Sequence, residues 1–204
     1  MRILALELST SRGNIASVDE DGEVLFREFP NDPKHSGAFF DNLRFVLDQG
    51  AQPGSIVVGL GPGSYAGVRI AIATATGLSA AYGASVFGVP SICGIDTNVP
   101  EYAVIGDARR QAFFFAQIAS GRCVEGPALF DESALHDRLS AFAHPVFTSQ
   151  VLPTFPEAAI AFPSASILAQ LPPAPAQVNP LEPLYLREPH ITLARKTSTL
   201  TTTK

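Results

Sequence analysis

The first 90 positions alternate between short apolar runs and longer segments with helical periodicity, which is typical of an α/β fold. Five apolar runs predict strands, at residues 2–8, 14–19, 23–29, 55–60 and 85–89. The Asp21-Gly22 pair separates the second run from the third and favours a tight hairpin there. The fourth run, "SIVVGL", is apolar throughout, as expected for a strand buried on both faces.

Two segments between these strands have the spacing of helices. Ser36 can cap the first helix, and its apolar residues fall on one face: Phe39, Phe40, Leu43, Val46 and Leu47. The second helix is expected from about Tyr65 to Tyr82, where small residues alternate with larger apolar ones and Arg69 is the only charge. Such a helix cannot present a conventional solvated face, so it is buried in its own lobe, meets another protein, or both.

The pattern restarts after residue 100. The runs "YAVIGD" and "QAFFFAQIA" predict strands around the turn "ARR", and "DESALHDRLSAF" predicts a helix capped by Asp131 or Ser133. Prolines then become frequent, which predicts short helices and irregular connections, with Pro172-Pro173 as a stiff link and a frayed tail, "KTSTLTTTK". We therefore expect two lobes, residues 1–100 and 101–204, the second of them shortened.

Composition narrows the functional classes. Charged residues make up 16% of the chain, against about 25% in an average soluble protein, which favours a surface partly covered by a partner. The formal net charge is −5 and no basic stripe is apparent, so the chain alone is a poor candidate for binding a phosphate backbone. No apolar run is long enough for a membrane helix, and the two cysteines lack metal spacing, which predicts a cytoplasmic protein.

The glycine-rich turn "GLGPGSYAG" could belong to several kinds of site. It contains no lysine, which excludes a Walker loop. Gly61, Gly63 and Ala66 match a dinucleotide fingerprint formally, but the acidic residue expected further on is missing. Pro62 and Ala66 stand where a nucleophile elbow around Ser64 needs glycine. Two interpretations remain: an anion site at a helix start capped by Ser64, or glycines that let strand and helix pack closely.

The stretch "GPGSYAGVRIAIATATGLS" resembles the signature of the TsaB family, also called YeaZ. Four further segments resemble the same family, in the right order: "MRILALELSTS", "HSGAFFDNL", "GDARRQAFFFA" and "PLYLRE". Together the five segments reach from the first residue to about residue 188, which is nearly the whole chain.

This resemblance implies an actin-like/Hsp70-like (ASKHA) fold of two related lobes, each with a mixed β-sheet and flanking helices. It also implies a role in forming threonylcarbamoyladenosine next to the anticodon of tRNA. TsaB-like proteins bind the paralogous transferase TsaD and support it without performing the transfer, and the ATPase TsaE completes the assembly. A homodimer is expected when the chain is alone, and contact with tRNA only through the complex.

The resemblance also locates the residues concerned. Family members pair through the first two helices, which places the following residues at a partner interface: Phe39, Leu43, Arg69, Ile72, Ala73 and Thr76. The signature turn itself comprises five matching positions: Gly61, Gly63, Ser64, Tyr65 and Gly67. Tyr65 and Ala66 replace the usual Phe-Thr of the family.

The sequence departs from a catalyst of this superfamily in its metal ligands. The transferase holds a metal through H-x-x-x-H, and no two of the four histidines have that spacing: His35, His136, His144 and His190. Glu7-Leu8 replaces the Asp-Thr usual at the end of the first strand, and we interpret Glu7 as a structural hydrogen-bond partner. We therefore expect no catalytic, cofactor or metal site.

Three functional hypotheses stay open at this point. The favoured one is a non-catalytic subunit of a tRNA-modifying transferase. The alternatives are an autonomous actin-like ATPase or peptidase ("glycoprotease"), and a homodimeric binding module without a tRNA role. Asp107, Arg109 and Arg110 could likewise form an anion site, although a turn capped by Asp107 with both arginines in solvent is the preferred interpretation.

Overall fold

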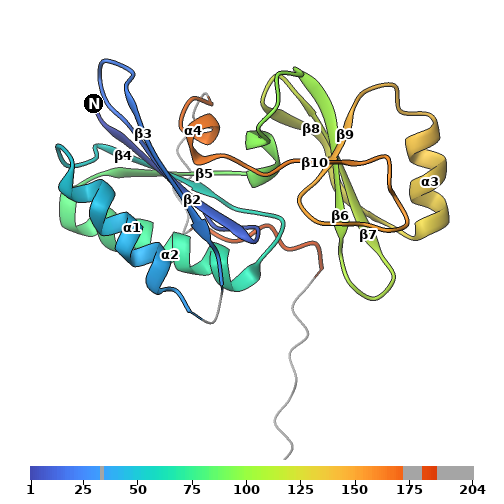
Figure 1. Ribbon diagram of the computed structural model, residues 1–204, viewed down its shortest axis with the longest axis horizontal. Coiled ribbons are helices and arrows are strands. Elements are labelled where there is room, and N and C mark those ends of the chain that lie inside the picture. Colours follow the sequence, from blue (N-terminus) through green and yellow to red (C-terminus); the bar gives the residue numbers. More distant parts are fainter. Residues whose placement is uncertain (33–34, 172–180, 188–204) are drawn as a thin grey trace, which may run out of the picture.

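The computed structural model describes residues 1–32, 35–171 and 181–187 and consists of two five-stranded β-sheets side by side (Figure 1). The elements of the first half are β1 (Ile3–Glu7), β2 (Arg12–Val18), β3 (Val24–Pro30), α1 (Gly37–Asp48), β4 (Ser55–Gly59), α2 (Tyr65–Tyr82) and β5 (Ser85–Val89). A 3-10 helix, η1 (Ser91–Gly94), leads to the second half. Its elements are β6 (Glu101–Asp107), β7 (Phe113–Ala119), β8 (Arg122–Phe130), α3 (Glu132–Ser140), β9 (Val146–Thr148), β10 (Ala159–Ile160) and α4 (Ala165–Leu168).

The two sheets have the same topology. Their strand orders are β3-β2-β1-β4-β5 and β8-β7-β6-β9-β10, and in each the first three strands are antiparallel and the last two parallel. α1 connects the third strand to the fourth in the first sheet, and α3 makes the same connection in the second. The chain therefore has two related lobes with mixed sheets, which confirms the fold expected from the sequence.

The two lobes differ in one helix. α2 connects β4 to β5 in the first lobe, whereas residues 149–158, all of them described, connect β9 to β10 without a helix. The described part of the second lobe correspondingly has no helix between its two parallel edge strands. The pairing of two long helices on one sheet face is thus a feature of the first lobe.

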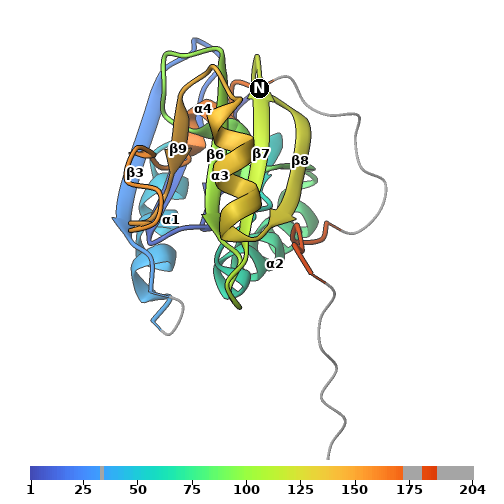
Figure 2. The same ribbon diagram turned by 90° about the vertical axis from the view of Figure 1, so that its right-hand side faces the viewer.

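α1 and α2 cover the same face of the first sheet (Figures 1 and 2). α2 begins after Ser64, whose side chain accepts a hydrogen bond from the Gly67 N–H, and ends at Gly83, which has a left-handed φ of 69°. Four residues of α2 are buried towards the sheet: Gly67, Val68, Ala71 and Ala75. Other small residues are exposed: Ala73, Thr76, Gly77, Ala80 and Ala81. The helix is therefore buried on one side and uncovered on the other.

α4 joins the lobes from the opposite face of the first sheet, where it packs against β1, β2 and β4 (Figure 1). The Asn14 side chain on β2 donates a hydrogen bond to the Pro163 carbonyl (3.0 Å) and accepts one from the Ala165 N–H (2.6 Å). Apolar residues of both sheets share one core around α4, including Ala5 of β1 and Val104 of β6. These contacts fix the position of one lobe against the other.

The structure corrects the sequence-based expectations at three points. The short strands β9 and β10 lie in the proline-rich stretch where only short helices and irregular connections were expected. Strand β8 was not predicted, because Gly126-Pro127 interrupts its apolar pattern and the pairing with β7 shifts register nearby. Ser36 precedes α1 but its side chain makes no capping hydrogen bond. The predicted Pro172-Pro173 link and the frayed tail lie outside the described residues.

None of the helices in the three described ranges combines the length and the apolar character needed to cross a membrane.

Candidate functional site

The signature turn packs directly against the end of β1. The Ser64 N–H donates a hydrogen bond to the Ser9 carbonyl at 2.6 Å. A Cβ atom on Gly63 would lie 2.1 Å from that same carbonyl oxygen, and one on Gly67 would lie 2.1 Å from the Leu8 carbonyl oxygen. Since no side chain fits at those distances, the glycines allow the close contact of strand and helix, which favours the second interpretation of this turn.

The beginning of the turn is fixed by η1. The Gly61 N–H donates to the Ser91 side chain (2.9 Å), and the Ser91 N–H donates to the Gly61 carbonyl (2.8 Å). Gly61 has a left-handed φ of 91°, a conformation that glycine adopts without strain. The Ser64 hydroxyl oxygen accepts from the Gly67 N–H at 3.2 Å and so acts as the predicted helix cap.

Glu7 lies at the end of β1 and has no exposed surface. Its Oε1 accepts a hydrogen bond from the Ser9 N–H at 2.6 Å, whereas Oε2 has no hydrogen-bond partner of standard geometry among the described residues. Burial raises the pKa of Glu7 above its ordinary value, and the nearby Ser9 and Ser91 hydroxyls partly oppose this shift. A Cβ atom on Gly59 would overlap Oε2, so this glycine encloses the carboxyl group. The contacts confirm Glu7 as a structural hydrogen-bond partner.

A cleft of about 520 Å³ opens between the lobes beside this turn. We call it the interlobe cleft. Hydroxyl groups from both lobes line it, including those of Ser9, Ser64 and Thr148, and its charged lining residues are Asp107 and Arg109. Glu7 does not line the cleft. The cleft therefore offers hydrogen-bonding groups to a small polar ligand.

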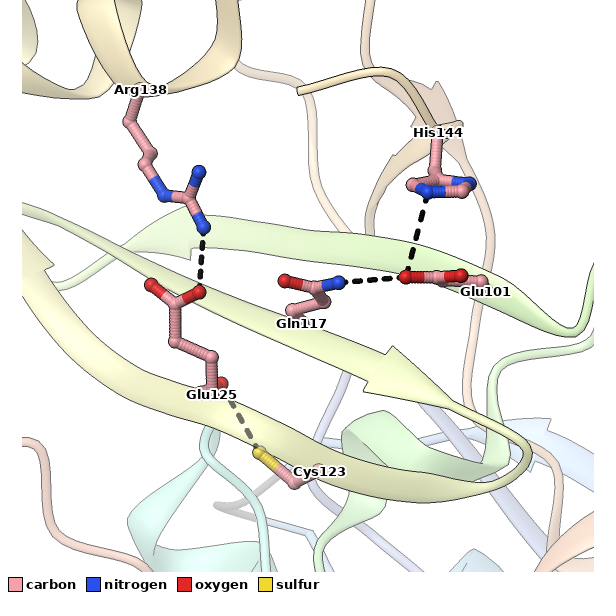
Figure 3. A network of polar contacts seen from close by, with 6 residues as sticks. All are labelled: Glu101, Gln117, Cys123, Glu125, Arg138 and His144. Carbon is pink, nitrogen blue, oxygen red and sulfur yellow. Dashed lines mark hydrogen bonds and ion pairs between the residues drawn. The ribbon is translucent and has the colours of Figure 1, made fainter. Parts of the chain in front are cut away.

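The three histidines among the described residues lie away from the interlobe cleft. His35 pairs with Asp32 at 2.8 Å, and the His136 ring packs on a phenylalanine with 4.5 Å between ring centroids. His144 approaches the Glu101 carboxylate at 3.4 Å, within the polar network of the second lobe shown in Figure 3. His190 lies outside the described residues. Among the described residues, no three His, Cys, Asp or Glu side chains are grouped so that they could hold a metal ion.

The network around His144 has a structural role. Glu101 also accepts a hydrogen bond from the Gln117 side chain at 2.8 Å, which links β6 to β7 (Figure 3). Arg138 of α3 binds Glu125 of β8 at 2.6 Å. The Arg138–Glu125 pair thus attaches α3 to β8, and the Glu101–Gln117 hydrogen bond joins two neighbouring strands.

The predicted interface residues on α1 and α2 differ in exposure, and Ile72 of α2 is half-buried against the core of the first lobe. Phe39 and Leu43 are buried between α1 and the sheet, so they support the surface from below. Arg69, Ala73 and Thr76 are exposed on α2. The Thr76 hydroxyl donates to the Ile72 carbonyl at 2.8 Å, which satisfies its donor within the helix. We call the exposed side chains of α1 and α2 the helix-pair surface.

Sequence analysis missed an aromatic residue on this surface. Phe40 was grouped with the core-facing residues of α1, yet its side chain is 48% exposed. It stacks on buried Phe39, with 4.9 Å between the ring centroids. A strictly periodic pattern cannot show this, because Phe39 and Phe40 are adjacent and only one of them can point into the core.

Sequence analysis also missed how residues 181–187 pack. This segment crosses the first lobe beside the signature turn, where the Leu184 N–H donates to the Leu60 carbonyl at 2.8 Å. The rings of Tyr185 and Tyr65 lie 5.6 Å apart. Its sequence, "LEPLYLR", contains all but the last residue of the family-like segment "PLYLRE", which was the available signal.

The turn between β6 and β7 is capped by Asp107, which is the interpretation preferred from the sequence. The Asp107 carboxylate accepts a hydrogen bond from the Arg109 N–H at 2.6 Å and so caps the turn. Arg109 and Arg110 are exposed, and both have left-handed φ angles, of 63° and 54°. The arginine side chains are thus held out from the turn at the edge of the interlobe cleft.

Comparisons with protein families and with curated proteins found one matching family model and several relatives. A family model described as tRNA N6-adenosine threonylcarbamoyltransferase (TsaD) matches residues 49–136. An uncharacterized protein of Mycobacterium leprae is 30% identical over 137 residues, which is 66% of this chain and 38% of that protein. An uncharacterized protein of Mycobacterium tuberculosis is 36% identical over 76 residues, 37% of this chain and 36% of that protein. The chain spans less than two fifths of the length of these relatives.

Solved structures share the fold over most of the chain. YeaZ from Pseudomonas aeruginosa superposes with a TM-score of 0.67 at 22% identity, over 84% of this chain and 90% of that one. A protein described as similar to the peptidase YeaZ from Pseudomonas aeruginosa superposes with a TM-score of 0.68 at 24% identity, over 91% and 99% of the two chains. Both structures show that the two-lobed architecture is that of YeaZ.

Proposed function

From its assignment to the TsaB (YeaZ) family, which the YeaZ fold and the TsaD family model support, we propose that this chain is a non-catalytic subunit. It binds a TsaD-type transferase and supports it in forming threonylcarbamoyladenosine next to the anticodon of tRNA. When isolated it pairs with a second copy of itself, and a TsaE-type ATPase joins through the complex.

The observation that carries this proposal is the helix-pair surface. α2 is an 18-residue helix whose exposed residues beyond Tyr65 and Arg69 are small and uncharged. An ordinary surface helix carries charged and polar residues on its outer face. Small residues instead allow a second helix to approach closely, so the outer side of α2 is suited to packing against a partner helix.

The geometry of the catalytic candidates supports a non-catalytic role. The Ser64 oxygen caps α2 and has no histidine beside it, because the histidines of the described ranges lie elsewhere. Glu7 is enclosed by Gly59 and does not reach the interlobe cleft. A nucleophile needs a base within hydrogen-bond reach, and a carboxylate must face its substrate.

A second candidate, an autonomous actin-like ATPase, is favoured by the interlobe cleft alone. Its volume of about 520 Å³ is within the range of small-molecule sites. Phosphate hydrolysis would also need groups that position water and neutralise charge, and the charged lining residues are Asp107 and Arg109. Measurement of ATP turnover separates this candidate from the first.

Co-purification tests the proposed function directly. The tagged full chain is expressed together with a TsaD-type protein of the same cell, and the captured material is analysed for that protein. We expect the two to co-purify in equal amounts and to modify tRNA together but not separately. Failure of the pair to associate at micromolar concentrations would contradict the proposal.

A further inference from the structure

Four arginines from three distant parts of the sequence come together at one end of the interlobe cleft. Arg69 lies in the first turns of α2, Arg109 and Arg110 form the tip of the β6–β7 turn, and Arg187 belongs to the 181–187 segment. Figure 1 shows the start of α2 and this turn on the same side of the molecule, with the 181–187 segment between them. Sequence analysis found no basic stripe, because these arginines become neighbours only in the fold.

Direct contacts connect Arg69, Arg109 and Arg187 to one another or to two tyrosines between them. The Arg69 guanidinium donates to the Tyr65 hydroxyl at 3.0 Å, and the Tyr65 ring lies 5.6 Å from that of Tyr185. Arg187 donates to the Arg109 carbonyl at 3.4 Å. Tyr65, Tyr185 and Arg109 also line one pocket. We call the six residues, namely Tyr65, Arg69, Arg109, Arg110, Tyr185 and Arg187, the arginine–tyrosine patch.

The charges of the patch are not neutralised internally. None of its four arginines forms an ion pair with a carboxylate in the part of the chain that the structure describes. Two carboxylates lie close: Asp107 is engaged by the Arg109 N–H, and Glu182 lies near Tyr185. Four guanidinium groups therefore face two carboxylates, which leaves the patch positive on a chain whose net charge is −5.

The aromatic residues of the patch are accessible. Tyr65 is 50% exposed and Tyr185 is 46% exposed, although large apolar rings are usually buried. Arg109, Arg110 and the neighbouring Gln111 all have left-handed φ angles, a conformation that glycine adopts with less strain, so the turn holds its side chains in an unusual backbone geometry.

We propose that the arginine–tyrosine patch binds RNA, with the arginines on backbone phosphates and an exposed tyrosine ring stacked on an unpaired base. Arginine forms paired hydrogen bonds with phosphate, and aromatic rings stack on bases that are free of a helix. An acidic protein would satisfy the arginines but would leave two exposed rings without a matching group. This inference rests on the proposed function, since the complex must hold a tRNA anticodon region.

Binding by the chain alone is weak, because few phosphates are contacted and the remaining surface is acidic. It strengthens at low salt, since each phosphate contact releases counterions. The patch therefore supplements the RNA contacts of a complex and does not replace them, which goes beyond the sequence-based expectation of contact with tRNA only through the complex.

Fluorescence anisotropy of a labelled RNA hairpin with an anticodon-like loop tests the proposal, using the full chain at low and at moderate salt. The double variant Arg109→Ala/Arg110→Ala should weaken binding about tenfold or more at low salt and lower the slope of log K against log salt by about 1.4–1.8. The control Arg44→Ala/Arg122→Ala removes two exposed arginines elsewhere and should change the affinity less than about twofold.

The tyrosine is tested separately. Tyr185→Leu should weaken binding about fivefold or more, because a stacked base contributes about 1–3 kcal/mol. Tyr185→Phe keeps the ring and should bind nearly as the unaltered chain does. Circular dichroism of each variant verifies folding.

Three results would overturn the proposal. The first is undetectable RNA binding by the unaltered chain at low salt, and the second is an equal loss of RNA affinity in the patch and control variants. The third is displacement of the RNA by poly-glutamate at equal charge concentration, which would identify a site for an acidic protein. Co-purification with the transferase is measured on the Arg109→Ala/Arg110→Ala and Tyr185 variants, which lie outside the helix-pair surface, and should be unchanged. RNA binding without co-purification would refute the proposed function. Co-purification without RNA binding would refute the RNA-binding role of the arginine–tyrosine patch.

Discussion

Placing a lysine at Ala73 is the most direct test of the helix-pair surface. Ala73 is exposed in the middle of α2, and the substitution adds a long charged side chain where a partner helix would pack. The one charge of α2, Arg69, lies a turn earlier and has the same sign, so it cannot pair with the new ammonium group. A charge buried without a partner in an interface costs about 3–5 kcal/mol.

This cost converts into a large change in affinity. At about 1.4 kcal/mol per tenfold change, Ala73→Lys should weaken association with the TsaD-type partner between about a hundredfold and a few thousandfold. The fold itself should be retained, because lysine has a high helix propensity and exposed substitutions usually change stability by less than about 0.5 kcal/mol. Self-association should be lost in parallel if the same surface forms the homodimer.

The assay combines capture of the tagged partner, sedimentation for self-association, and circular dichroism with thermal melting. Ser140→Lys adds the same charge at an exposed position on α3 and serves as the matched control. Ala73→Ser should bind nearly as the unaltered chain does, because it adds no charge and little volume. Undiminished capture by folded Ala73→Lys and Thr76→Lys variants would refute the reasoning and place the partner on another surface.

Three further predictions concern the site residues. The purified chain should neither hydrolyse ATP nor cleave peptides above background. The Ser64→Ala variant should only lose a helix cap worth about 1 kcal/mol of stability. Turnover by the unaltered chain that disappears in this variant would contradict the prediction. Gly67→Ala should destabilise the chain by about 2 kcal/mol or more in urea unfolding, because its Cβ would lie 2.1 Å from the Leu8 carbonyl oxygen. Gly77→Ala in the same helix meets nothing within 4 Å and should stabilise by about 0.5–1 kcal/mol, so similar effects of the two would argue against the described packing. Glu7 has a raised pKa in the folded state, so it holds its proton more tightly than it does in the unfolded chain. Its contribution to the free energy of unfolding is therefore fully present below the ordinary pKa of 4.5. That contribution declines as the pH rises through the pKa of the folded state. Urea unfolding at pH 5 and pH 8 should show a larger decline for the unaltered chain than for Glu7→Gln, and equal declines would exclude this residue as the cause.

Local signals predicted most of the first lobe. The bounds of α2 follow from a serine cap at its start and a glycine at its end, both of which act within a few residues. The tightly packed glycine turn was one of two interpretations left open by the sequence. A choice between them required the 2.1 Å distance from Gly67 to the Leu8 carbonyl oxygen, which depends on the position of β1.

What the sequence did not reveal depends on distant contacts. Strand β8 contains Gly126-Pro127, which reads as a turn until β7 is present to pair with it. The periodic pattern of α1 placed Phe39 and Phe40 together, although the position of the sheet decides which ring is covered. The arginine–tyrosine patch joins three segments that are distant in the sequence. No periodic pattern along the chain shows that these segments lie close together in the fold.

The difference between the lobes sets a limit on assembly. Two long helices lie together on a sheet face of the first lobe, while the connection between β9 and β10 in the second lobe forms no helix, so the described part of the chain carries one helix-pair surface. If the proposed homodimer and the proposed transferase complex both use this surface, a second copy and the transferase compete for it. By mass action, overproduction of the chain alone would then increase the self-associated form without adding further subunits to the complex.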